Sequence, residues 1–327
     1  MNLTGRLSLI LAAVVGSGML LAACGTGGSS YPSKTIVFST HSNPGGGGDI
    51  LGRQLAEALK KQNINAVLEN RAGGSGAVNV AYVASKPAGG YTLAIVTLSN
   101  LITPILASTP HTYKDFRPVA QLQTENEAIL VRADAKWQTV EDLVKEAKEN
   151  PGKIKWGGGF LGNIDSLVAF QLGNVAGYKV DYVPFEGGGE VTTALLGGHV
   201  LVAVSNPAES VPQLEAKQFR MLAITSDKRS PIYKDVPTLK EKGINVVQEQ
   251  WRGVWAPKGT PDDVVKRLEE ILPKAMKEES FQKYMKDGML AEAFLGSADF
   301  TAALEKQDKE ISTLIDQLGL RGSQTKK

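Results

Sequence analysis

Residues 35–50 read TIVFSTHSNPGGGGDI, an apolar run that passes through four consecutive glycines into the start of a second apolar pattern. The first run predicts a strand over 35–40, and apolar residues at helical spacing predict a helix over 49–62. Glycine loses more backbone freedom on folding than any other residue. A strand-to-helix turn of this composition is therefore expected to serve a purpose beyond connection.

The same succession of strand, glycines and helix recurs along the chain. Three further clusters, at 73–76, 157–159 and 187–189, each follow a predicted strand and precede a predicted helix. Such alternation is typical of βαβ units, so we expect an α/β fold with mostly parallel sheets. Ligands of open α/β sheets bind beyond the carboxyl ends of the strands, where helix N-termini attract anions. The clusters together predict a binding site for an anionic ligand.

Other segments extend this pattern to the rest of the chain. Strands are expected in 66–70, 91–97, 128–134, 153–159, 179–185, 199–207, 219–226 and 251–257. Helices are expected in 77–85, from Thr139, near 163–174, in 190–196 and 209–216, from Pro261 and in 298–318.

The composition describes an ordinary globular protein. The chain has 327 residues, 42% of them hydrophobic and 21% charged, which suggests about two domains. The net charge is +2 and no basic block occurs, so nucleic acid is not an expected partner.

The first 30 residues have the layout of a secretory signal peptide. Arg6 precedes an apolar stretch from Leu7 to Leu21, which is shorter than the roughly 20 residues that a spanning helix needs. The sequence Leu-Ala-Ala-Cys that ends at Cys24 resembles a bacterial lipobox, and Cys24 is the one cysteine of the chain. We therefore expect a lipoprotein signal peptide (1–23), a lipid-anchor tether (24–33) and a location outside the cytoplasm, anchored to the membrane through lipid on Cys24.

Signals for catalysis are weak. Gly157-x-Gly159-x-x-Gly162, with Asp181 further on, matches a dinucleotide fingerprint, but nicotinamide cofactors are not found where the signal peptide directs the chain. The three histidines, His41, His111 and His199, lie far apart in sequence. We expect no enzyme, no cofactor and no metal; the alternative, an extracytoplasmic enzyme, needs a polar triad or a metal in the cleft.

A family resemblance rests on seven motifs in order: SNPGGGGDILGRQLAEAL, ENRAGGSGAVNVAYVASKPAGGYTL, KDFRPVAQL, YVPFEGGGEVTTALLGGHV, SNPAESVPQL, MLAITSDKRSP and VPTLKEKGINVVQEQWRGVWAPKGTP. Together they resemble the substrate-binding proteins of tripartite tricarboxylate transporters, the Bug family, and within it the citrate-binding TctC type. The resemblance covers about 31–320.

The resemblance implies a two-lobed, periplasmic-binding-protein-like (type II) α/β fold with a ligand cleft between lobes joined by two crossing strands. Lobe 1 is expected over 34–125 plus 229–327, and lobe 2 over 126–228. Family members bind small carboxylates such as citrate and deliver them to a two-component membrane permease. A monomer is expected. The alternative function is a sensor that presents its bound carboxylate to a signalling receptor.

The resemblance also implies the ligand-binding residues. Loops after the first two strands hold a carboxylate through backbone N–H groups and water, and the second lobe completes the cleft. The implied positions are Ser42, Asn43, Gly45, Gly46, Ser75, Gly76, Ser99, Asn100, Gly159, Gly162, Asn163, Phe185, Gly187, Asn206 and Trp251.

Two acidic residues depart from the expectation of an anion site. Relatives often carry Lys where this chain has Glu186, and Asp165 lies near the second-lobe helix start. Inside the cleft, Glu186 would repel an anion by about 4 kcal/mol at about 4 Å for an effective dielectric constant near 20. Either these acids face solvent, or the ligand carries less negative charge than citrate or brings a cation. Arg252 is either a ligand clamp or part of a hinge ion pair.

Overall fold

The computed structural model describes residues 31–107 and 109–322. The predicted signal peptide, Cys24 and most of the predicted tether lie outside the described residues. Within residues 31–107 and 109–322, no helix is both long enough and apolar enough to cross a membrane.

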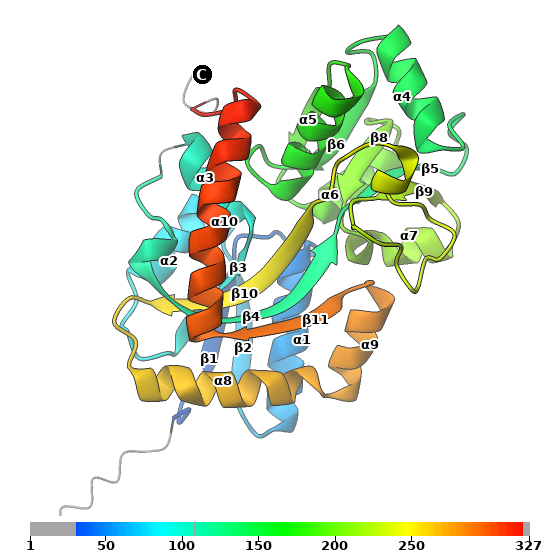
Figure 1. Ribbon diagram of the computed structural model, residues 1–327. Helices are drawn as coiled ribbons and strands as arrows, with labels where there is room; N and C mark the ends of the chain where they lie inside the picture. The colour runs from blue at the N-terminus through cyan, green and yellow to red at the C-terminus, as the bar shows by residue number, and fades with distance from the viewer. Residues whose placement is uncertain (1–30, 108, 323–327) are drawn as a thin grey trace, which may run out of the picture. The chain divides into compact units, whose positions relative to one another are not determined.

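The first sheet has six strands in the order β11-β4-β10-β3-β1-β2 (Figure 1). Strands β1 to β3 are mutually parallel, whereas β10 is antiparallel to both β3 and β4, and β11 is antiparallel to β4. The bounds are β1 Ile36–Thr40, β2 Ala66–Asn70, β3 Thr92–Thr97, β4 Phe116–Asn126, β10 Glu249–Pro257 and β11 Ala291–Gly296.

The second sheet has five strands in the order β7-β6-β8-β5-β9. Strand β6 is parallel to β7 and β8, and β5 is antiparallel to β8 and β9. The bounds are β5 Ala128–Arg132, β6 Lys155–Gly159, β7 Asp181–Phe185, β8 Val202–Ser205 and β9 Phe219–Ile224.

Both sheets are mixed, so the prediction of mostly parallel sheets is wrong. The reason is the path of the chain. Strand β5 enters the second sheet directly from β4, and β10 brings the chain back, so each runs against its neighbours in its sheet. The strands connected by helices keep the parallel arrangement that βαβ units impose. The prediction of an α/β fold is confirmed.

Helices flank both sheets. Those of the first sheet are α1 Gly47–Lys61, α2 Ala77–Ala84, α3 Ser99–Ala107, α8 Asp262–Met276, α9 Glu279–Asp287 and α10 Ser297–Gln317. Those of the second sheet are α4 Val140–Glu149, α5 Ile164–Ala176, α6 Gly188–Leu196 and α7 Val211–Glu215. Elements β4, β11, α3 and α9 were not predicted. The helix expected over 209–216 is instead a 3-10 turn, Pro207–Ser210, followed by the short α7.

The apolar core connects the two sheets. One contiguous cluster of buried side chains includes Trp251 and Phe300 beside the first sheet and Trp156 and Leu172 in the second. A second cluster packs α1 and α8 against the first sheet, with Phe38 and Leu268 fully buried. Burial of this kind fixes the ends of the strands, which position the site.

Helix α4 begins with the capping box that its sequence predicts. The Thr139 hydroxyl accepts a hydrogen bond from the Asp142 N–H (3.2 Å), and the Asp142 carboxylate accepts one from the Thr139 N–H (3.0 Å). Thr139→Ala is expected to lower the free energy of unfolding by about 1 kcal/mol, because the helix loses this cap. Chemical denaturation measures the change.

Thr313→Ala is the matched control for this prediction. The Thr313 hydroxyl is exposed within α10 and bonds back to the Lys309 carbonyl (2.9 Å), an interaction that stabilises helices little. Equal losses for the two variants would contradict the assigned role of the capping box.

Candidate functional site

A polar cavity lies where the two sheets face each other, and we call it the central cleft. The empty space inside it, open solvent at its mouth included, is about 460 Å³. The first sheet and its loops contribute His41, Ser42, Gly46, Thr97, Ser99, Gln250 and Arg252; the second contributes Gly159, Phe160, Asn163, Asp165, Glu186, Gly187, Gly188, Asn206 and Glu209, and Glu127 lies at the junction.

The two sides of the central cleft touch each other directly. The Gly47 N–H donates to the Glu209 Oε1 (2.7 Å), and the Asn43 Nδ2 donates to the Glu190 Oε1 (2.9 Å). The His41 ring meets another ring, that of Phe160, edge-on, with 5.7 Å between centroids. These contacts join loops of the first sheet to loops of the second, so the structure is a closed conformation.

The glycine run that opens α1 has its N–H groups bonded within the protein. Gly45 donates to the Asp49 Oδ2 (3.0 Å), Gly46 donates to the Asn43 carbonyl (3.0 Å), and the Gly47 N–H is taken by the contact described above. In this conformation these three donors do not face a ligand, contrary to the hypothesis from the sequence. The carboxylate of Glu209 occupies the position at the start of α1 where a helix attracts an anion.

Close packing explains why glycine is needed there. A Cβ atom at Gly47 would lie 2.1 Å from the Arg252 Nη2, and one at Gly48 would lie 2.3 Å from the Thr40 Oγ1. The glycines therefore allow the guanidinium of Arg252 to pass against the first turn of α1. This close approach is the purpose that glycine serves at this strand-to-helix turn.

A buried ion pair lies beside the cleft. Arg252 on β10 pairs with Glu125 on β4; the two residues are 4% and 2% exposed. The Gln250 Nε2 also donates to the Glu125 Oε1 (2.9 Å). Burial by itself lowers the pKa of Arg252, but the charges of Glu125 and Glu209 outweigh it and raise that pKa, so the guanidinium stays charged.

Two further carboxylates line the cleft and are held by protein donors. Asp165 accepts bonds from the Gly159 N–H (2.7 Å) and the Asn163 Nδ2 (2.9 Å). Glu209 accepts one from the Ser205 hydroxyl (2.9 Å) in addition to Gly47. Burial raises the pKa of Asp165 to about 6 and that of Glu209 to about 7, although these bonds act in the opposite direction for Asp165.

Glu127 occupies the junction between β4 and β5. Its backbone is fixed by Thr225, which follows β9: the Glu127 N–H donates to the Thr225 hydroxyl (3.0 Å), and the Thr225 N–H donates to the Glu127 carbonyl (2.9 Å). The side chain is fully buried, and neither carboxylate oxygen has a hydrogen-bond partner among the described residues. Burial, followed by the charges of Asp165, Glu125 and Glu209, raises the pKa of Glu127 well above its usual value, while Arg252 lowers it.

Seven of the residues that the family resemblance implied line the central cleft. They are Ser42, Gly46, Ser99, Gly159, Asn163, Gly187 and Asn206. Asp165, which is buried, lines it as well, so this acid lies in the cleft; Glu186 also lines it but is exposed to solvent. The cleft thus contains more negative charge than an anion site is expected to have.

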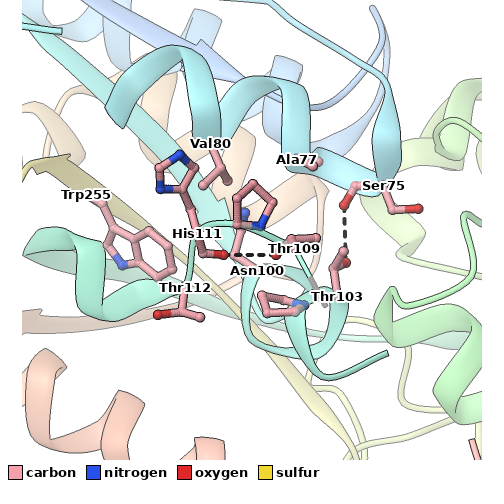
Figure 2. A pocket seen from close by; sticks show the side chains of 12 residues that line it. Ser75, Ala77, Val80, Asn100, Thr103, Thr109, His111, Thr112 and Trp255 are labelled. Carbon is pink, nitrogen blue, oxygen red and sulfur yellow. Dashed lines mark hydrogen bonds between the residues drawn. The ribbon is translucent and has the colours of Figure 1, made fainter. Parts of the chain in front are cut away.

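Three implied residues lie in a different cavity (Figure 2). Ser75, Gly76 and Asn100 line a space of about 330 Å³ in the first sheet's layer, together with His111 and Trp255. No residue of this cavity lines the central cleft. Hydrogen bonds close its wall: the Thr103 hydroxyl donates to the Ser75 carbonyl (3.2 Å), and the Thr109 hydroxyl donates to the His111 carbonyl (2.9 Å).

The remaining implied residues lie apart from both cavities. Asn43 and Phe185 line a depression outside the rim of the cleft, and the Gly162 N–H donates to the Ser166 hydroxyl (3.1 Å). Gly45 lines neither cavity. Trp251 is 2% exposed, contacts Phe300 edge-on and donates to the Gln307 Oε1 (2.5 Å).

Sequence reasoning missed several cleft residues, above all Glu127 and Glu209. Both follow a strand closely: Glu127 lies between β4 and β5, and Glu209 lies four residues after Ser205, the end of β8. An acid just beyond a strand end was the available signal. Within the described part of the chain, no group of three or more His, Cys, Asp or Glu side chains is placed to hold a metal ion.

Two α/β sheets, between which the chain passes twice, and a polar cleft lined from both are the features of two-lobed solute-binding proteins. The chain belongs to the family described as "Tripartite tricarboxylate transporter family receptor", whose profile matches residues 51–320. The resemblance drawn from the sequence motifs is thereby confirmed. This is a family of solute-binding receptors that work outside the cytoplasm.

Individual relatives agree with this assignment. A Cupriavidus necator protein, described as UPF0065 protein in gbd 5'region, is 29% identical over 317 residues, which cover 96% of this chain and 97% of its own length. The periplasmic binding protein BugD is 25% identical with a TM-score of 0.85 and coverage of 89% and 99%. R. palustris Rpa4515, solved with adipate, is 26% identical with a TM-score of 0.84 and coverage of 88% and 98%.

Arg252→Met is expected to destabilise the protein by about 3–5 kcal/mol, because it leaves Glu125 buried without its counter-charge. Chemical denaturation of this variant and of Arg252→Met with Glu125→Gln measures the coupling. The second substitution should recover a large part of the loss, since it removes the unpaired charge. Additive losses would show that the ion pair does not carry the effect.

The stability of the ligand-free protein should depend on Asp165 and Glu209 between pH 5 and pH 8. Their folded-state pKa values, about 6 and about 7, lie above the ordinary 3.8 and 4.5, so the folded state binds more protons in this window. Their contribution is fully favourable below the ordinary values and is lost as the pH rises through the folded values.

The measurement compares denaturation at pH 5 and pH 8 for the wild type and for Asp165→Asn with Glu209→Gln. Burial lowers the pKa of His41 to about 4, which acts in the opposite direction in both proteins. The prediction therefore concerns the difference: the wild type loses more stability, or gains less, between pH 5 and pH 8 than the double variant does. Parallel pH profiles would contradict it.

Proposed function

We propose that this protein is the extracytoplasmic receptor of a tripartite tricarboxylate transporter, that it captures a small organic acid in the central cleft, and that it delivers this acid to a two-component membrane permease without catalysis. Lobe 2 (126–228) closes on lobe 1 (34–125 plus 229–327), and lipid on Cys24 tethers the monomeric receptor to the membrane. The observation that carries the proposal is the cleft itself, which is lined from both sheets and closed by direct contacts across its rim.

Family membership and one relative support an organic acid as the ligand. The family is named for tricarboxylate transport, and the structure of Rpa4515 contains adipate. Closure stabilises the bound state because only the closed form offers contacts from both sheets to one ligand.

The loops that meet across the cleft explain how the permease distinguishes the ligand-bound receptor from the empty one. The bonds from Gly47 to Glu209 and from Asn43 to Glu190 exist only while the two sides of the cleft meet. A ligand that bridges the two sides strengthens this contact. The permease then recognises a receptor surface that exists in the closed form alone.

Thermal denaturation of the full-length protein in detergent tests the proposal with citrate, succinate, malate, adipate, aminocarboxylates and neutral sugars. A ligand at about 100 times its Kd adds about 2.7 kcal/mol, which corresponds to an increase in Tm of about 5 °C for a chain of this size. At least one organic acid is expected to give such an increase.

Two variants of α6 connect the increase in Tm to the cleft. A Cβ atom at Gly188, which lines the cleft, would lie 1.7 Å from the Glu209 Oε2, so Gly188→Leu should displace the Glu209 carboxylate, put a side chain into the cleft and abolish the increase. Thr193→Leu, an exposed position of the same helix, should leave it unchanged. An increase that persists in Gly188→Leu would place the ligand elsewhere.

A further inference from the structure

The central cleft has an unequal balance of charge. Among the described residues that line it, Arg252 is the one Lys or Arg side chain, and it is already paired with Glu125. Glu127, Asp165 and Glu209 add three carboxylates without a second cation. A di- or tricarboxylate would bring further negative charge into this surrounding, where burial strengthens repulsion.

The unpartnered groups of the cleft are mainly acceptors. Asp165 and Glu209 take hydrogen bonds from the protein, whereas both oxygens of Glu127 and the Gln250 Oε1 have no partner among the described residues. The unpartnered nitrogens are the Arg252 Nε and the His41 Nδ1. When Glu127 is ionised, a ligand that satisfies these acceptors must donate hydrogen bonds, which a carboxylate does not do.

Glu127 is fixed where such a ligand group would need it. Its backbone pairs with Thr225 at the junction of the two sheets, and its side chain is 0% exposed while it lines the cleft. A buried carboxylate with both oxygens unsatisfied lowers stability. An ammonium or amidinium group supplies both the donors and the counter-charge that this site lacks.

We propose that the ligand of the central cleft carries a cationic nitrogen that donates hydrogen bonds to Glu127, so that the substrate is an aminocarboxylate and not a di- or tricarboxylate that lacks an amino group. This inference rests on the proposed function and names the charge class of its ligand. The carboxylate of the ligand lies among the donors that line the cleft, the Arg252 Nε–H and the hydroxyls of Ser42 and Ser99.

Proton release accompanies binding. Without ligand, burial and the charges of Asp165, Glu125 and Glu209 favour the protonated form of Glu127, against the opposing charge of Arg252; His41 stays neutral because burial lowers its pKa to about 4. A cationic nitrogen reverses this preference. The heat of binding therefore depends on the ionisation enthalpy of the buffer, and affinity rises as the pH rises.

Isothermal titration of the full-length protein with matched ligands tests the proposal. The pairs are succinate with aspartate, glutarate with glutamate, glutarate with 4-aminobutanoate, and adipate with 6-aminohexanoate; putrescine and calcium chloride are added alone. We expect at least one aminocarboxylate to bind about tenfold or more tightly than its matched diacid, the range of a hydrogen bond between charged groups.

Glu127→Gln provides the matched variant. It keeps the shape of the side chain and removes the carboxyl group that ionises when a cationic ligand binds. The preferred aminocarboxylate should lose about 30-fold in affinity or more, and the matched diacid should bind equally or more tightly. Glu249→Gln, at an exposed position of β10, should change neither affinity. If Glu127→Gln did not fold, the comparison of matched ligands on the wild type would still show whether the cleft prefers a ligand with a cationic nitrogen.

The remaining outcomes separate the cationic-nitrogen inference from the proposed function. A diacid that binds more tightly than its amino partner, or a diacid that loses affinity in Glu127→Gln, overturns the cationic-nitrogen inference and leaves the proposed function standing. Binding that requires calcium overturns the inference too. Putrescine binding that depends on Glu127 supports the cationic nitrogen, overturns the aminocarboxylate and removes the organic acid from the proposed function. No binding by any of these compounds overturns both.

Discussion

The pairing of Arg252 with Glu125 is the interaction on which the central cleft depends. It joins the two long strands β10 and β4 at the edge where the chain leaves the first sheet, and it neutralises one of four buried carboxylates. The same guanidinium passes so close to Gly47 that no side chain fits there. Gly47 at the start of α1 and the charge balance of the cleft therefore both depend on one buried cation. A lysine, which has a single charged point and no planar fork, would not meet Glu125 and α1 together.

Closure changes what the helix N-terminus of α1 offers. A helix start attracts an anion, and in the closed form Glu209 from the opposite side supplies it. A dicarboxylate bound there would have to displace Glu209, which would lose the Gly47 N–H and keep only the Ser205 hydroxyl as a donor. In the closed form, the Glu209 carboxylate thus forms one of the contacts that hold the two sides of the cleft together. Recognition is left to groups deeper in the cleft, where the protein has satisfied Asp165 and not Glu127.

Much of the fold could be predicted from the sequence, because glycine clusters and changes in the spacing of apolar residues mark where strands end and helices begin. The helix starts at α4 and α8 follow from Thr139 and from Pro261 with its acidic successors. The mixed sheets were not readable: local pattern does not reveal that β5 and β10 carry the chain between sheets. Trp251 illustrates a signal that could have been used. Its neighbours Gln250 and Arg252 line the cleft, so the alternation of a strand turns Trp251 to the opposite face, against Phe300.

The site was harder to predict than the fold for a physical reason. Backbone N–H groups at glycine turns look alike whether they face a ligand or a carboxylate of the protein, and only the packed structure shows that Glu209 takes the Gly47 N–H. Glu127 carries no motif at all, since its role arises from being held by Thr225, 98 residues further along the chain. Its importance comes from its surroundings: Glu127 has no hydrogen-bond donor among the described residues, whereas the neighbouring Asp165 and Glu209 do. A family fold can keep its closing loops while one such residue changes the charge of the ligand that it accepts.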